Sequence, residues 1–128
     1  LQWFVYEMEK EDIYLFKCGY DRWSAAYLVQ SMKERFGDDV MVPVAQGKQT
    51  LSGPMKNLAA DLAAKRIVYG NNPILKWCMT NVAVDVDRND NIQPCKTSNP
   101  RKRIDGFASL LDAYTALEQN KEDYMNLI

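Results

Sequence analysis

The chain has 128 residues, of which 47% are apolar and 26% are charged, so it is long enough for one core and typical of a soluble globular protein. It contains no histidine, which excludes serine–histidine triads, histidine-ligated zinc and imidazole acid–base chemistry within this polypeptide. The formal net charge is −1, so global charge argues neither for nor against a polyanionic partner, and local patches must decide.

The first half of the chain predicts a helix followed by a strand–helix–strand unit. Helical spacing of apolar residues covers 1–10, and 13–20 is rich in β-branched and aromatic residues, as in an interior strand. An amphipathic helix is expected over 23–36 and a short strand over 40–44. This order favours a right-handed crossover with the two strands parallel.

The second half alternates helices with a hairpin. Residues 45–53 are expected to be a loop, with Pro54 starting the next helix, because proline is favoured in a first helical turn. The predicted elements are, in order, a helix over 55–65, a short helix over 73–80, hairpin strands over 82–86 and 92–96, and a last helix over 104–117. We therefore expect one α/β domain over residues 1–128.

Cysteine usage and hydropathy indicate the kind of cellular compartment. Cys18, Cys78 and Cys95 form no CxxC pair, and such a scattered odd set suggests a reducing compartment without a disulfide framework. No apolar run approaches the roughly 20 residues that span a bilayer, so no membrane partner is expected. The chain enters abruptly at Leu1 in an apolar stretch and is interpreted as a fragment of a longer protein.

Two aspartates are the candidates for chemistry. Asp21 ends the apolar run that predicts the first strand, and Asp105 begins the last helical pattern. Open α/β sheets place ligands beyond the C-terminal ends of their strands, and paired carboxylates suit a hard cation such as Mg²⁺. The alternative is that both are helix caps or first-turn acids, which is ordinary for aspartate and is favoured for Asp21 from local physics alone.

A basic stretch precedes Asp105, and other charged residues add weaker signals. Lysine and arginine can clamp phosphate oxygens, although most charge runs are simply solvated. Asp112 lies two helical turns after Asp105 and could be a third ligand, but a surface acid is favoured. Lys48 lies in a loop that could contact a phosphate backbone. The basic stretch consists of Lys96, Arg101, Lys102 and Arg103.

Two further patterns have structural interpretations. Asp85, Asp87 and Asp90 form a D-x-D-x-x-D cluster that lacks the glycine and distal glutamate of a calcium loop, so a hairpin turn is favoured. The three tryptophans are spaced as core or near-core residues rather than as base-stacking platforms: Trp3, Trp23 and Trp77.

An ordered set of motifs makes the chain recognisable. It resembles the terminase large subunits of tailed phages over residues 14 to about 117. Each motif is weak alone, and the resemblance depends on their order. The matching segments are GYDRWSA at 19–25, VPVAQG at 42–47, SGPMKNL at 52–58, GNNPILKW at 70–77, NV at 81–82, NIQP at 91–94 and RIDG at 103–106.

This resemblance implies the C-terminal nuclease domain of a DNA-packaging motor, with a ribonuclease-H-like mixed sheet flanked by helices. In that family three acidic positions hold two Mg²⁺ or Mn²⁺ ions, and the enzyme cuts concatemeric double-stranded DNA in the host cytoplasm. Asp21 matches the second acid and Asp105 the third. Full-length relatives engage a portal protein and a small terminase subunit.

The chain also departs from the family pattern. No residue matches the first acid, which lies on an earlier strand, and the ATPase domain that would bind ATP is absent, so the domain is expected to be N-terminally truncated and weakly active or inactive alone. Two alternatives remain open. One is another ribonuclease-H-like nuclease of the resolvase or integrase type, and the other is a non-catalytic α/β interaction module.

Overall fold

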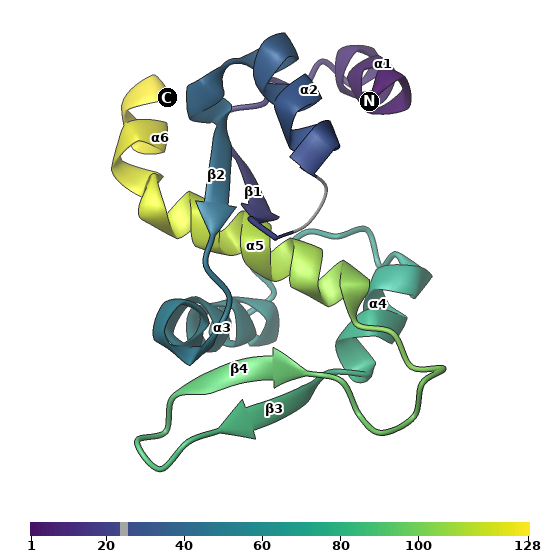
Figure 1. Ribbon diagram of the computed structural model, residues 1–128, viewed down its shortest axis with the longest axis vertical. Coiled ribbons are helices and arrows are strands. Elements are labelled where there is room, and N and C mark those ends of the chain that lie inside the picture. Colours follow the sequence, from purple (N-terminus) through teal and green to yellow (C-terminus); the bar gives the residue numbers. More distant parts are fainter. Residues whose placement is uncertain (24–25) are drawn as a thin grey trace.

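The computed structural model describes residues 1–23 and 26–128 and forms a mixed α/β fold (Figure 1). The predicted helix start at Trp23 runs into residues 24–25, which lie outside the described part. The elements are, in chain order, α1 Gln2–Lys10, β1 Cys18–Asp21, α2 Ala26–Phe36, the 3-10 turn η1 Asp38–Val40, β2 Met41–Val44, α3 Lys48–Ala63, α4 Pro73–Thr80, β3 Ala83–Val86, β4 Ile92–Cys95, α5 Asp105–Gln119 and α6 Lys121–Leu127.

β1 and β2 pair in parallel, as the strand–helix–strand order predicts. The register aligns Cys18 with Met41 and Asp21 with Val44, so both strands end at the same edge. Only the last part of the predicted 13–20 strand is extended in a ladder, and the strand continues one residue further, to Asp21. The carboxylate at position 21 therefore belongs to the C-terminal residue of a strand.

α5 is the central element of the fold. In Figure 1 it crosses the molecule with β1 and β2 on one side and α3 and the β3–β4 hairpin on the other. Gly19 allows the close approach of β1, because a Cβ at that position would lie 2.3 Å from the backbone oxygen of Asp112 on α5. The core between α3, β2 and α5 is formed by Val44, Leu51, Met55, Leu58, Phe107 and Leu111.

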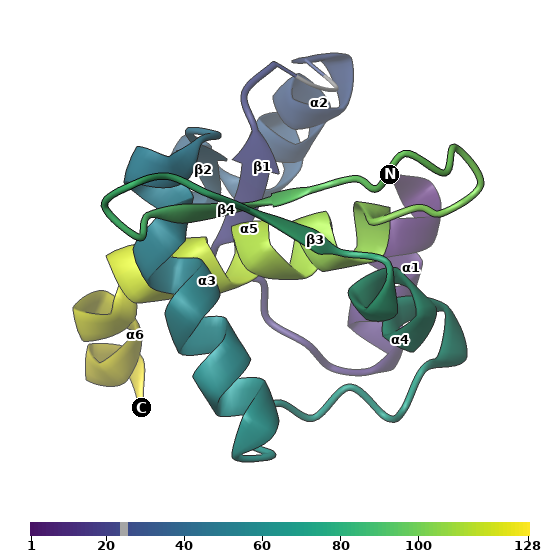
Figure 2. The same ribbon diagram turned by 90° about the horizontal axis from the view of Figure 1, so that it is seen from below.

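The four strands form two separate two-stranded sheets rather than the single mixed sheet that the sequence predicts. β3 and β4 pair antiparallel, which confirms the hairpin, and this hairpin packs on α3. Figure 2 shows the hairpin in front of α3 and α5, with β1 and β2 behind them. The two sheets stay apart in the described residues because these two helices lie between them. The α/β class is confirmed.

α3 begins at Lys48, not at Pro54, so the predicted loop over 45–53 is wrong from residue 48 onward. Gly47 has a φ of 118° and its carbonyl accepts the Leu51 N–H at 3.0 Å, which starts the helix. Leu51 is 2% exposed and extends the buried face that Met55 and Leu58 continue. Burial of this face outweighs the missing N–H of Pro54, which lies inside the helix.

The tryptophans are not core residues, which corrects the sequence prediction. Trp3, Trp23 and Trp77 are 73%, 81% and 44% exposed. α1 turns Phe4 rather than Trp3 toward the small cluster around Val29 and Met32, and α4 buries Cys78 instead of its neighbour Trp77. Within the described residues, no helix is long and apolar enough to cross a membrane.

Candidate metal site and DNA interface

Three aspartates line one groove of about 380 Å³ beside α5. Asp21 and Asp105 lie 84 positions apart in the sequence (105 − 21), yet the end of β1 and the start of α5 bring both to this groove. Asp112 joins them from two turns further along α5, on the same helix face. The remaining lining is small or polar: Gly19, Tyr20, Gln46, Ala108 and Ser109.

The two principal acids differ in their local contacts. The Oδ1 of Asp21 accepts the backbone N–H of Trp23 at 3.0 Å, which shapes the turn after β1. Asp105 is exposed in the first turn of α5, and the residue at the cap position is Ile104, with no side-chain capping bond. Asp105 is therefore not a cap, but it does occupy the first helical turn, as the alternative interpretation expected. Among the described residues, the Asp21 carboxylate accepts one hydrogen bond, from the Trp23 N–H.

Asp112 is half-buried in the groove, in contrast to the surface position that the sequence favoured. Gln46 Nε2 donates to Asp112 Oδ1 at 3.2 Å and to the Val44 carbonyl at 3.1 Å, so one amide links β2 to α5. Burial raises the pKa of the Asp112 carboxyl, the Gln46 hydrogen bond opposes that rise, and the nearby charge of Asp21 adds to it. The charge of Asp21 therefore adds to the burial that disfavours the ionised form of Asp112.

The donor chemistry of this groove fits a hard divalent cation, because carboxylate oxygens are the ligands that Mg²⁺ and Mn²⁺ prefer. A cation would also relieve the repulsion between Asp21 and Asp112. The described residues nevertheless contain no group of three or more acidic or cysteine side chains close enough to hold one ion together. The three aspartates thus lie along the groove, but among the described residues they do not converge on one three-ligand site.

Comparison with known proteins decides the family. Residues 5–121 match the family model described as "Terminase large subunit, endonuclease domain". The chain belongs to this family. The Escherichia coli (strain K12) protein named "Protein YmfN" is 31% identical over 87 residues, which cover 66% of the chain and 19% of that relative. No solved structure matches the chain significantly.

In this terminase domain the basic stretch ends two residues before Asp105, which lines the groove, while its own side chains are not part of the groove lining. Lys96, Arg101, Lys102 and Arg103 are exposed in the segment that connects β4 to α5, which Figure 1 shows running past α4 to the start of α5. Buried Asn81 donates from Nδ2 to the Arg103 carbonyl at 2.9 Å and so fixes the end of this segment two residues before Asp105. The NV motif at 81–82 includes Asn81, but no local pattern indicates its contact with residue 103, 22 positions away.

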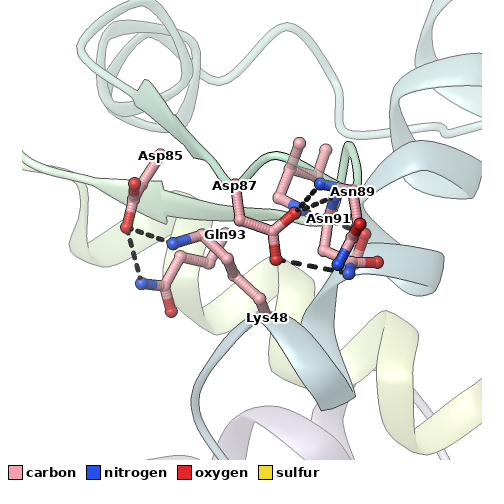
Figure 3. Close-up of polar contacts among 8 residues, drawn as sticks. Lys48, Asp85, Asp87, Asn89, Asn91 and Gln93 are labelled. Atoms are coloured by element: carbon pink, nitrogen blue, oxygen red, sulfur yellow. Dashed lines mark hydrogen bonds and ion pairs between the residues drawn. The ribbon is translucent and has the colours of Figure 1, made fainter.

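Lys48 has a structural contact that the sequence did not predict. Its Nζ lies 2.8 Å from Asp85 Oδ2, and Gln93 Nε2 donates to the same oxygen at 3.0 Å (Figure 3). The Lys48 hydrogen bond is the main reason why the pKa of Asp85 lies below its usual range. In this structure Lys48 ties the start of α3 to the hairpin, while its predicted contact with DNA stays a prediction.

The acidic cluster on the hairpin is a turn, as the sequence favoured over a calcium loop. Asp87 Oδ1 accepts the backbone N–H groups of Asn89 at 2.8 Å and Asn91 at 2.9 Å (Figure 3). These bonds, led by the one from Asn91, lower the pKa of Asp87. The carboxylates of Asp87 and Asp85 are thus both bound by groups of the protein itself.

Proposed function

We propose that this chain is part of the metal-dependent endonuclease of a phage or prophage DNA-packaging motor, cutting concatemeric double-stranded DNA. Family membership supports a nuclease role in DNA packaging. The observation that carries the site assignment is the meeting of Asp21 and Asp105 in one groove, despite their distance along the chain. Both also occupy the motif positions of the family's second and third acids.

Asp21 and Asp105 are proposed to hold Mg²⁺ or Mn²⁺, with Asp112 as a further carboxylate in reach. When bound, two such ions supply an activated water and stabilise the leaving 3′-oxygen of an in-line displacement. The strand end fixes Asp21 and the first helical turn fixes Asp105, so both ligands are carried by regular elements rather than by mobile loops. Gln46, in the loop after β2, donates to Asp112 and orients it.

The ligand set of residues 1–128 is proposed to be incomplete. The family's first acid and its ATPase domain are expected upstream, and the chain spans about a fifth of the length of the curated relative it matches. We propose that ATP binds only in that upstream domain. Portal protein, small terminase subunit and host cytoplasm are the partners and location that the whole protein would have.

A plasmid-cleavage assay with Mn²⁺ tests this function. A protein extended upstream should cut, whereas the 128-residue chain alone should cut poorly, because metal affinity falls when a charged ligand is missing. In the extended protein Asp21→Asn and Asp105→Asn should each reduce cleavage by at least about 100-fold, since each removes a metal ligand. Asp123→Asn changes an exposed acid on α6 and is the matched control.

Two outcomes would change the proposal. Full cleavage by the extended Asp21→Asn and Asp105→Asn variants would refute the metal-site assignment. Robust cleavage by the 128-residue chain, abolished by Asp105→Ala, would show that the expected upstream ligand is unnecessary.

The basic stretch is proposed to bind the DNA backbone without sequence preference. Replacing Arg101, Lys102 and Arg103 together by alanine should weaken DNA binding of the full-length protein and flatten its salt dependence by up to about three counterions, at roughly one per lost phosphate contact. DNA affinity measured against salt concentration for both proteins gives this slope. Identical slopes would assign the stretch to the solvated surface.

The two alternatives are distinguished by separate observations. An interaction module in which both aspartates are caps should bind no Mn²⁺, and Asp105 already lacks a capping bond. A resolvase- or integrase-type nuclease would keep the carboxylate pair, but the terminase family match over 5–121 favours the packaging enzyme.

A further inference from the structure

Arg22 and Trp23 form an exposed pair at the end of β1, directly after Asp21. The Arg22 guanidinium carbon lies 5.0 Å from the centre of the Trp23 ring. The Trp23 side chain is 81% exposed, so it contributes little to the core. Its backbone N–H is bound to Asp21 Oδ1 at 3.0 Å, which ties the turn that carries the pair to the proposed metal ligand.

Stacking leaves the hydrogen-bonding edge of an arginine free. A guanidinium contacts an aromatic ring through its face, while its N–H donors point outward in its plane and match the oxygens of a phosphate. Among the described residues Arg22 forms no ion pair, although three acids line the adjacent groove. The fixed cation therefore still has its capacity to bind an anion.

A second pair in the same chain shows what an occupied arginine looks like. Arg35 lies 5.3 Å from the ring centre of its neighbour Phe36, at the far end of α2. Its Nη2 is also 3.4 Å from Glu9 Oε1 on α1, so its charge is already paired within the protein. Arg22 has the same aromatic support without such a carboxylate.

We propose that Arg22, held by Trp23, binds a backbone phosphate of duplex DNA adjacent to the phosphate that enters the carboxylate groove. This inference rests on the proposed nuclease function for its ligand. Asp21 and Arg22 are consecutive, with Cα atoms about 3.8 Å apart. The same backbone turn therefore positions both the proposed metal ligand and the arginine that binds the phosphate. Trp23 acts as a positioning residue for the guanidinium.

The test measures DNA binding in EDTA, where cleavage does not enter, using a fluorescent duplex and the 128-residue chain over a range of salt concentrations. Arg22→Ala should weaken binding about tenfold, the usual effect of one lost bond to a charged group. It should also reduce the salt slope by about one, as for one phosphate contact. Arg35→Ala, the matched control, should change neither quantity.

Two further variants separate charge from positioning. Trp23→Ala keeps the arginine charge but removes its support, so affinity should fall while the slope changes little. Trp23→Phe retains a ring face and should restore most of the affinity. Arg22→Ala with wild-type affinity and slope would overturn the phosphate contact, and Trp23→Ala with wild-type affinity would overturn the positioning role.

The nuclease proposal is judged separately by Mn²⁺-dependent cleavage with the extended protein. An inactive extended protein that still loses DNA affinity on Arg22→Ala would retain the phosphate contact and reject the nuclease. An active enzyme whose Arg22→Ala variant binds DNA normally would support the nuclease and reject the phosphate contact.

Discussion

The aspartates on the two sides of α5 are in opposite situations. On the side of α3 and the hairpin, Asp61, Asp85 and Asp87 each accept hydrogen bonds from cations, hydroxyl, amide or backbone groups, and each has a pKa below its usual range. On the side of β1, the described residues give Asp21 one backbone hydrogen bond, α5 has no side-chain capping bond at Ile104, and the pKa of Asp112 is raised by burial. Acids of the first kind are bound by groups of the protein, and those of the second kind are the proposed metal ligands.

This difference separates carboxylates that have partners in the protein from the proposed metal ligands better than sequence position does. A carboxylate with a lowered pKa stabilises the folded state near neutral pH, whereas one with a raised pKa destabilises it there. The Asp21 charge beside Asp112 adds a repulsion of this destabilising kind, and a divalent ion bound between the two carboxylates would relieve it.

The largest effect is expected where β1 meets α5. In Gly19→Ala the new methyl would lie 2.3 Å from the Asp112 backbone oxygen, and backbone cannot yield as a side chain can. Such overpacking should cost about 3 kcal/mol or more and displace the strand that carries Asp21. Urea unfolding measures the loss. Gly53→Ala, where an added Cβ meets nothing within 4 Å, should change stability far less, and equal effects would contradict this packing.

A smaller loss is expected from Tyr114→Phe on the partnered side. The Tyr114 hydroxyl donates to Asp61 Oδ2 at 2.6 Å, and its removal should lower Tm by about 4 °C. Burial and this bond raise the pKa of Tyr114 to about 12. Its contribution should be complete below the unfolded value near 10 and disappear as pH rises from about 10 to 12. A difference between the two proteins that persists unchanged to pH 12 would refute this.

Breaking the Lys48–Asp85 pair should have a still smaller effect. Lys48→Met and Asp85→Asn should each lower Tm by about 2–3 °C, and the double variant should lose less than the sum. Since the pKa of Asp85 is lowered, the stabilisation is present above its unfolded pKa and is lost as pH falls through the lowered value. Thermal unfolding scans over this acidic pH range measure the loss of stabilisation. Additive losses would mean that the 2.8 Å contact contributes nothing.

The smallest effect should have the opposite sign. Asp112→Asn removes a half-buried charge whose pKa is raised, so in EDTA at neutral pH the variant should melt about 1–2 °C higher than the wild type. The wild type loses stability as pH rises through the raised pKa, so the two proteins should converge in acid. A lower Tm for the variant at neutral pH would place Asp112 among the structural acids.

Much of the local structure could be predicted from the sequence. Apolar spacing and turn residues located the hairpin, the parallel strand pair and the central helix, because each pattern acts over a few residues. The start of α3 was missed because burial of Leu51 outweighs the local preference of Pro54. The tryptophans were misplaced because spacing shows which residues share a face, not which face meets the core.

The candidate site, too, could be predicted only in part from the sequence. Asp21 and Asp105 could be named from motifs, but their shared groove depends on β1 packing against α5 through Gly19, a contact between distant segments. The Lys48–Asp85 pair and the Gln46–Asp112 bond join residues 37 and 66 positions apart, which no local pattern encodes. Likewise, the sequence does not show that Arg22 stacks on an exposed Trp23 directly after Asp21.

The most direct test of the central claim is the position of a bound metal. Crystals of the upstream-extended protein soaked in Mn²⁺ should show anomalous density between the carboxylates of Asp21 and Asp105, because these acids form no ion pair within residues 1–23 and 26–128 and offer hard oxygen ligands. Asp105→Asn should remove or weaken that density. An empty groove, or Mn²⁺ bound instead at the hairpin acids Asp85 and Asp87, would contradict the account.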